Sequence, residues 1–175
     1  KIGFISEFFC DHTIGKLFKG IILQLNQDKF DVNVFHSHKT EKNNIYKEFI
    51  NAEKNSNIRN FTLPEYLKDG KKIIENQDLD ILFFTDIGMS SEFYYYSFLR
   101  LAKYQITTWG HPETTGNETI DYFLSSKLIE TENAQSHYTE KLLLLDLLPM
   151  YFYKPKINQE LDENKLNSEN FYSCP

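Results

Sequence analysis

Short apolar runs alternate along the chain with segments in which apolar residues recur at helical spacing. The runs are rich in β-branched and aromatic residues and are bounded by polar residues, which is typical of buried strands. The predicted strands cover residues 2–5, 32–35, 58–61, 79–84, 106–109, 122–124 and 142–145.

The segments between these runs have the spacing of amphipathic helices. Ile14, Leu17, Phe18 and Ile21 follow the i, i+3, i+4, i+7 rule. Further helices are predicted around residues 45–50, after Pro64 as far as residue 74, and across an aromatic segment at 93–102. Pro64 suits the first turn of its helix, where a proline is tolerated.

The order of these elements predicts an α/β fold. Strands that are continuously apolar and alternate with helices indicate a parallel sheet covered on both faces. We therefore expect a Rossmann-like, doubly wound, mostly parallel sheet. Ligands of such sheets bind at the carboxyl ends of the strands. The loops after the first, fourth and fifth strands contain His12, residues 86–91 and residues 111–116.

Composition excludes several classes of partner. The 175 residues suffice for one domain with a core, and a net charge of -6 without a Lys/Arg-rich block argues against nucleic acid and anionic lipid. The apolar runs are far shorter than the roughly 20 residues of a membrane span. We expect a soluble, cytoplasmic protein with no membrane partner.

The C-terminal segment differs from the rest of the chain. Residues 154–170 are polar and lack apolar periodicity, whereas residues 171–175 read as the start of another strand. The predicted division is a Rossmann-like domain at 1–153, followed at 154–175 by a linker and the beginning of a second domain.

A dense polar loop between two predicted strands is the strongest functional signal. It contains the run Trp-Gly-His-Pro-Glu-Thr-Thr-Gly at residues 109–116, followed by Ile-Asp-Tyr at 120–122. This run resembles the signature of glycosyltransferase family 41, which includes the protein O-GlcNAc transferases, the SPINDLY-like proteins and bacterial protein N-glucosyltransferases. The resemblance extends to the segments at 1–6, 11–17, 80–84 and 134–142.

The resemblance implies a fold and an activity. Members of the family have a two-domain GT-B catalytic region, of which this chain would be the first half. They invert the sugar carbon and transfer a sugar such as GlcNAc from a UDP-sugar to a protein side chain. The second domain holds most of the nucleotide, and neither a metal nor another cofactor is expected. The alternative is a flavodoxin-like domain that binds a partner without catalysis.

Two residues after the first predicted strand are candidates for the site. A histidine pKa near neutrality suits a proton acceptor, and in the resemblance the histidine aligned with His12 lies at the active site. His12 is predicted to be catalytic, with Asp11 beside it in the substrate site. Alternatively, Asp11 or Thr13 caps the helix and His12 is a solvated turn residue.

The signature loop supplies the second group of candidates. His111 is predicted to be catalytic and to contact the sugar or a diphosphate oxygen, and the loop is predicted to bind substrate through Gly110, Pro112, Thr114, Thr115 and Gly116. Alternatively, glycine and proline only shape a turn, the threonines cap the next segment of the chain, and His111 packs on Trp109.

Other acidic and aromatic residues are weaker candidates. Asp86 follows a predicted strand and is predicted to touch substrate. Asp78 and Asp80 match a metal-binding DxD pattern, but they precede a strand and so lie opposite the ligand edge. The aromatic run at 94–98 is interpreted as a helix buried between layers rather than a platform for a sugar.

Overall fold

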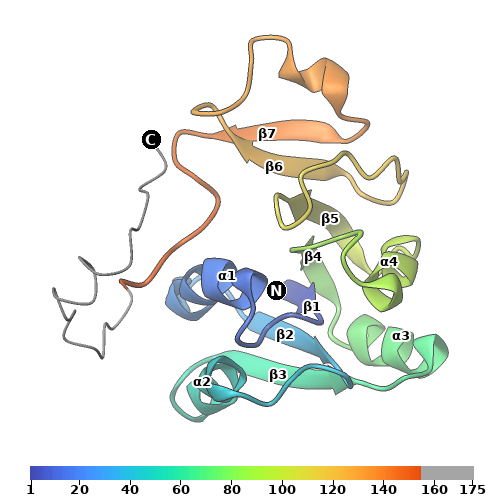
Figure 1. Ribbon diagram of the computed structural model, residues 1–175. Helices are drawn as coiled ribbons and strands as arrows, with labels where there is room; N and C mark the ends of the chain where they lie inside the picture. The colour runs from blue at the N-terminus through green and yellow to red at the C-terminus, as the bar shows by residue number, and fades with distance from the viewer. Residues whose placement is uncertain (155–175) are drawn as a thin grey trace, which may run out of the picture.

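Seven parallel strands form one sheet in the computed structural model, which describes residues 1–154. Their order across the sheet is β3-β2-β1-β4-β5-β6-β7 (Figure 1). The strands are β1 (Ile2–Ser6), β2 (Val32–Ser37), β3 (Ile58–Leu63), β4 (Leu79–Phe84), β5 (Ala102–Thr108), β6 (Tyr122–Ser126) and β7 (Lys141–Leu145). All six pairings are parallel, so the predicted Rossmann-like fold is confirmed.

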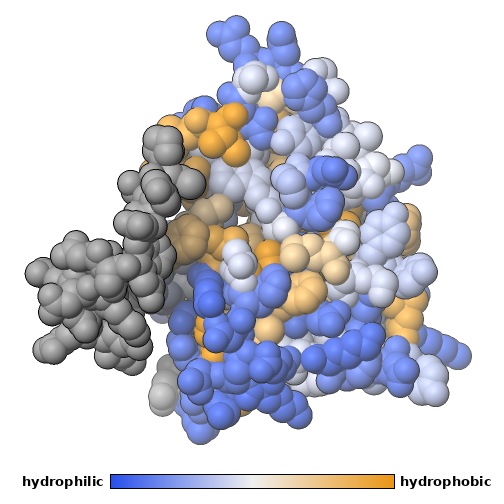
Figure 2. Space-filling view, in the orientation of Figure 1, coloured by the Kyte–Doolittle hydropathy of each residue, from blue (hydrophilic) through white to orange (hydrophobic). Residues whose placement is uncertain are grey.

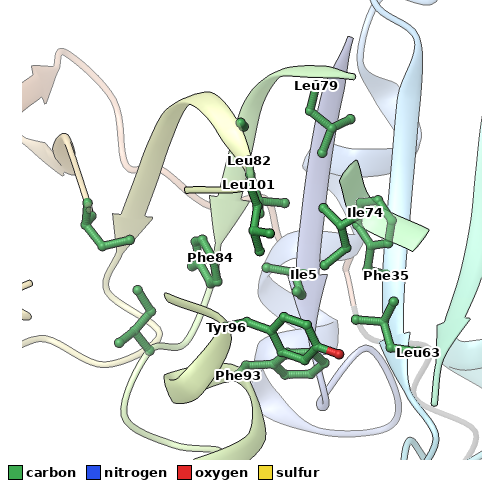
Figure 3. Packing of buried hydrophobic residues seen from close by; sticks show 13 residues of the cluster. Ile5, Phe35, Leu63, Ile74, Leu79, Leu82, Phe84, Phe93, Tyr96 and Leu101 are labelled. Atoms are coloured by element: carbon green, nitrogen blue, oxygen red, sulfur yellow. The ribbon is translucent and has the colours of Figure 1, made fainter. Parts of the chain in front are cut away.

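Helices cover both faces of this sheet (Figure 1). They are α1 (Thr13–Gln24), α2 (Asn44–Ala52), α3 (Leu67–Glu75) and α4 (Ser91–Ser97), with 3-10 turns η1 (Glu53–Asn55) and η2 (Ala134–His137). Successive residues of one strand serve the two faces, because side chains alternate along a strand. Phe4 of β1 packs in the cluster with α1 and α2, and its neighbour Ile5 packs in the cluster with α3 and α4. Figure 3 shows the second cluster, in which Phe93 and Tyr96 of α4 lie near Ile5 and Leu63.

The predicted aromatic helix at 93–102 was too long. α4 ends at Ser97, and Ala102 already pairs with Leu79 as the first residue of β5. The chain leaves the helix because side chains from later in the sequence bind residues 100 and 101. The amide of Leu101 donates to Gln105 Oε1 at 2.8 Å, and the Arg100 guanidinium donates to both oxygens of Asp121 at 2.6 and 3.1 Å.

Two smaller expectations were also wrong. α3 begins at Leu67, so Pro64 precedes the helix and does not lie in its first turn. The aromatic run is only partly buried. Tyr96 is fully buried, but the rings of Tyr95 and Phe98 are 61% and 49% exposed.

The chain returns to α1 after β7. The amide of Tyr151 donates to the carbonyl of Leu17 at 3.0 Å, and the Tyr151 ring packs so tightly on Gly20 that a Cβ there would lie 2.2 Å from a ring carbon. The predicted linker and second-domain strand lie outside the described residues, apart from Lys154. None of the helices within residues 1–154 is long and apolar enough to cross a membrane.

Candidate functional site

Three loops meet at the carboxyl edge of the sheet, after β1, β4 and β5. The Ser90 hydroxyl after β4 donates to Glu7 Oε2 after β1 at 2.6 Å. Gly110 after β5 packs on β4 so closely that a Cβ would lie 1.8 Å from the carbonyl oxygen of Thr85. A side chain at position 110 would therefore separate these loops. His12 and His111 do not follow neighbouring strands, since β4 lies between β1 and β5.

His12 is itself the N-cap of α1. Its backbone is extended, with φ -126° and ψ 161°, and its Nδ1 accepts a hydrogen bond from the amide of Ile14 at 3.2 Å. The imidazole stacks on Phe8 with 4.5 Å between ring centroids. The predicted caps, Asp11 and Thr13, do not have this role.

The cap fixes how His12 can act. A ring nitrogen that accepts a hydrogen bond carries no proton, so the neutral imidazole has its proton on Nε2. In this arrangement the free side of His12 donates a hydrogen bond. It can take a proton there only if the cap hydrogen bond is broken and the tautomer changes.

Asp11 contacts other groups of the protein and does not cap α1. Its carboxylate forms an exposed ion pair with Lys16 at 2.7 Å, and its amide donates to Asn43 Oδ1 at 2.9 Å. Asn43 caps α2 with the same oxygen, accepting from the amide of Tyr46 at 3.4 Å. Asn43 therefore joins the loop after β1 to α2, and substrate contact by Asp11 stays a prediction.

Asp86 is a buried carboxyl at the end of β4. It is 3% exposed, and its Oδ1 accepts from the Thr85 hydroxyl at 2.6 Å. Within residues 1–154, Oδ2 is enclosed and has no hydrogen bond of adequate geometry. Burial raises the pKa of Asp86 to about 6, against the lowering effects of hydrogen bonding by Thr85 and by the nearby Ser6 hydroxyl. The carboxyl edge thus contains an acid that titrates close to neutral pH.

His111 lies beside the loop that follows β4. A Cβ at Gly88 would lie 3.3 Å from carbons of the His111 ring, and Gly88 has a φ of 100°, which favours glycine. The neighbouring Trp109 is held elsewhere, because its indole Nε1 donates to Ser125 Oγ at 2.9 Å. The signature loop therefore places His111 against the segment after Asp86.

Thr114 and Thr115 bind a carboxylate of the protein itself. Thr114 Oγ1 donates to Glu140 Oε2 at 2.7 Å, and the amide of Thr115 donates to Glu140 Oε1 at 2.8 Å, joined there by the Thr115 hydroxyl. Glu140 precedes β7 and is 2% exposed. Burial by itself raises the pKa of Glu140, but the hydrogen bonds from Thr115 and Thr114 outweigh it and the pKa is lowered.

The threonine hydroxyls thus fix the loop to the segment before β7, and ligand binding by them stays a prediction. Pro112 and Gly116, the two other loop positions predicted to bind substrate, are both exposed. Gly116 has a φ of 64°, and a Cβ there would meet nothing within 4 Å. Its backbone conformation, not lack of space, is what favours glycine.

Comparison with known proteins agrees with this geometry. The family model for glycosyl transferase family 41 matches residues 1–157. The chain belongs to glycosyltransferase family 41. No curated protein sequence matches the chain significantly.

A solved structure of an O-GlcNAc transferase has the same fold. The chain matches a mutant O-GlcNAc transferase from Thermobaculum terrenum with a TM-score of 0.72 at 19% sequence identity. The match covers 85% of this chain and 28% of that one. The family 41 chain described here therefore spans a little over a quarter of the length of that enzyme.

The structure of this family 41 chain separates the predicted site residues into two groups. His12, Asp86 and His111 lie on loops that contact one another at the carboxyl edge, whereas Thr114 and Thr115 act within the protein. Glu140 was missed. It lies in a segment that carries the family resemblance, but it is 25 residues from Thr115 in the sequence, and no local pattern marks it as the acceptor for the signature loop.

The acidic pair Asp78 and Asp80, at the start of β4, lies at the opposite edge. Asp80 forms an ion pair with Lys103 of β5 at 2.6 Å, and hydrogen bonding by Lys103 is the largest cause that lowers the pKa of Asp80 to about 2. This position agrees with the interpretation of Asp78 and Asp80 as solvated residues at the amino edge. Within the described part of the chain, no group of three or more His, Cys, Asp or Glu residues is arranged to hold a metal ion.

Proposed function

We propose that this chain forms the acceptor side and sugar side of an inverting glycosyltransferase. The donor is a UDP-sugar such as UDP-GlcNAc, and the acceptor is a side chain of another protein. The observation that carries the proposal is the meeting of the family 41 signature loop, at Gly110 and His111, with the loops that hold His12 and Asp86.

The chemistry of this edge supports the proposal. Inversion places acceptor and leaving group on opposite faces of the sugar, and the acceptor must lose a proton as it attacks. Asp86 is the carboxyl on these loops whose pKa burial raises toward neutral pH. An Asp86 carboxyl with a pKa of about 6 is mostly ionised at pH 7, and its negative charge, with no well-oriented hydrogen bond on Oδ2 within residues 1–154, attracts the proton that the acceptor loses. His12 with its proton on Nε2 orients the acceptor as a hydrogen-bond donor in this scheme.

The nucleotide would be held mainly by protein outside this chain. The match to a little over a quarter of the Thermobaculum terrenum enzyme supports this division. An exposed apolar surface also supports it. Figure 2 shows orange surface over the end of β7, where Leu144, Leu145, Leu147 and Leu148 are 38% to 75% exposed. Apolar surface of this kind marks contact with another part of a protein.

A transfer assay on the whole protein that carries this chain tests the proposal. The protein is incubated with UDP-GlcNAc, UDP-glucose or GDP-fucose and candidate acceptor proteins, and the mass of the acceptor is measured. We expect the mass of one N-acetylhexosamine to be added from UDP-GlcNAc. Addition of glucose or fucose instead would correct the sugar. The folded protein transferring none of the three would favour the flavodoxin-like binding domain.

The chain alone offers a second test. We expect UDP to bind the 175-residue chain with a dissociation constant weaker than about 1 mM, because most nucleotide contacts would be missing. Isothermal titration calorimetry measures this constant. Low-micromolar binding would contradict the proposed division of the nucleotide site.

A further inference from the structure

A pocket of about 210 Å³ lies between α4 and the segments that follow β2 and β3. His38 follows β2, Glu65 follows β3, and Glu92 and Tyr95 belong to the first two turns of α4. Since β2, β3 and β4 end at one edge of the sheet, the pocket opens at the carboxyl edge, beside the candidate site. None of the predicted site residues is among the residues that line it.

Glu92 gives this pocket a buried carboxylate with one unpaired oxygen. Its side chain is 10% exposed, and Oε2 accepts from the Ser37 hydroxyl at 2.7 Å. His38 Nδ1 lies 3.7 Å from the same oxygen. Oε1 has no hydrogen-bond partner among the residues that the structure describes. Oε1 itself is enclosed, and a carboxylate with little solvent and an unpaired oxygen is costly, so a cation held against Glu92 in the pocket would offset part of that cost.

The remaining walls are suited to an organic cation. Glu65 adds a second carboxylate, the Tyr95 ring is 61% exposed, and Leu67 adds apolar surface. Aromatic faces attract ammonium and guanidinium groups. Lys39 is the single lysine or arginine in the lining, and it is exposed.

Tyr96 lies at the base of the pocket, and the negative charge of Glu92 affects the pKa of its hydroxyl. Figure 3 shows its hydroxyl directed from α4 toward Leu63, and Gly70 of α3 makes room for it, since a Cβ there would lie 1.8 Å from the oxygen. Burial, and then the charge of Glu92, raise the pKa of Tyr96 to about 12. The hydroxyl therefore stays protonated at neutral pH.

We propose that this pocket binds one organic cation, the ammonium or guanidinium group of a lysine or arginine side chain presented by a polypeptide. The cation lies against the Glu92 carboxylate, and its alkyl stem lies on Tyr95 and Leu67. The volume is below the roughly 300–1,000 Å³ of drug-sized sites and matches a single side chain. A neutral sugar also stacks on a tyrosine, but it satisfies only the hydrogen bond of Glu92 and not its charge.

The pocket extends the proposed function without depending on it. If the protein transfers a sugar, the polypeptide is its acceptor, and a basic residue near the modified side chain enters the pocket. Cation binding is measured without a sugar donor. Failure of transfer and failure of cation binding are therefore separate results.

The test is a titration of the 15N-labelled chain with Nα-acetyl-arginine methylamide, followed by NMR. We expect saturable shifts at His38 and at residues 91–96, with a dissociation constant on the order of 1 mM for a single side chain. Nα-acetyl-citrulline methylamide has the same shape without the charge, and it should bind at least about 10-fold more weakly.

Variants assign the interaction to Glu92. Glu92→Gln should weaken arginine binding about 10-fold or more, and Glu132→Gln, an exposed carboxylate elsewhere, should leave it unchanged. If Glu92→Gln does not fold, Tyr95→Ala removes an exposed ring and should weaken binding about 3-fold. Absence of saturable shifts, equal binding of citrulline, preferred binding of methyl glucoside, or wild-type binding by a folded variant at either position would overturn the proposal.

Discussion

Acidic residues at the two edges of the sheet differ in burial, in ion pairing and in pKa. At the amino edge, Asp80 pairs with Lys103 and Asp121 pairs with Arg100, all in solvent-accessible positions. At the carboxyl edge, Asp86 is buried and the Glu92 side chain is 10% exposed, and each has one enclosed carboxylate oxygen without a hydrogen bond in the described part of the chain. The pKa of Asp80 is lowered to about 2, whereas the pKa of Asp86 is raised to about 6.

This difference separates stability from function. Paired, hydrated acids cost little, whereas a buried acid without a cation destabilises the fold unless it becomes protonated. Such groups gather at sites that act on ligands. The carboxyl edge, where the loops with His12 and His111 also meet, therefore carries the proposed activity.

The largest expected effect is a loss of turnover when His12 is substituted in the whole protein. His12→Ala removes both the helix cap and the Nε2 donor, and it should lower the single-turnover rate about 100-fold or more with little change in donor affinity. His12→Asn separates the two roles, because asparagine caps helices well but has no imidazole. A rate for His12→Asn as low as that of His12→Ala places the effect in the chemistry. Recovery of the wild-type rate by His12→Asn would leave only the capping role.

Glu140 should have the largest effect on stability. Glu140→Ala leaves the Thr115 amide and two threonine hydroxyls without their acceptor and should lower the free energy of unfolding by about 3 to 5 kcal/mol. Urea denaturation measures the change, with exposed Glu132→Ala as the control, expected within about 0.5 kcal/mol of wild type. A loss below about 1 kcal/mol for Glu140→Ala would show that these hydrogen bonds do not hold the signature loop.

Asp86→Asn should stabilise the fold at neutral pH. Because the folded pKa of about 6 lies above the ordinary value of 3.8, the native state binds more protons than the unfolded state between these pH values, and stability falls as pH rises through that window. Asparagine removes this penalty. The gain should reach at most about 3 kcal/mol above about pH 6 and vanish below about pH 4.

The effect of Asp86 on stability is obtained from the difference in the free energy of unfolding between wild type and Asp86→Asn at each pH, not from the pH dependence of either protein alone. His36 has the opposite effect, because burial lowers its pKa to about 4 and stability is lost as pH falls from 6.5 toward that value. His36 is present in both proteins, so its contribution cancels in the difference between their urea unfolding curves. A gain independent of pH, or a loss at neutral pH, would contradict the assignment of Asp86 as a buried, unpaired acid.

Substitutions at the amino edge should have the smallest effects on stability and turnover. Asp121→Asn weakens the ion pair with Arg100 and should cost about 1 kcal/mol, and Asp80→Asn, at a fully exposed pair, should leave the melting temperature unchanged within error. Neither should change the single-turnover rate. A loss of turnover in either variant would break the distinction between the two edges.

The fold could be predicted from the sequence because each helix and strand is marked by a local pattern of residues. The periodicity of α1 and the apolar run of β4 each specify an element within a few residues, and β5 was predicted too short only because Tyr104 near its exposed start does not read as buried. The end of α4 was missed because it depends on Gln105 and Asp121, which bind the turn from later in the chain.

The site was less predictable because its contacts are distant in sequence. The signature loop and His12 were found, but the acceptor for Thr114 and Thr115 is a glutamate next to another strand. Likewise, the identity of Asp86 does not reveal that its Oδ2 has no partner within residues 1–154, because that depends on what β1 and the loop at Gly110 place around it.

The most direct test of the difference between the edges is an NMR titration of the side-chain carboxyl carbons of Asp86 and Asp80 in the 13C-labelled chain. We predict that Asp86 titrates near pH 6 and Asp80 near pH 2. Titration of both carboxyls near the reference value of about 4 would contradict this difference.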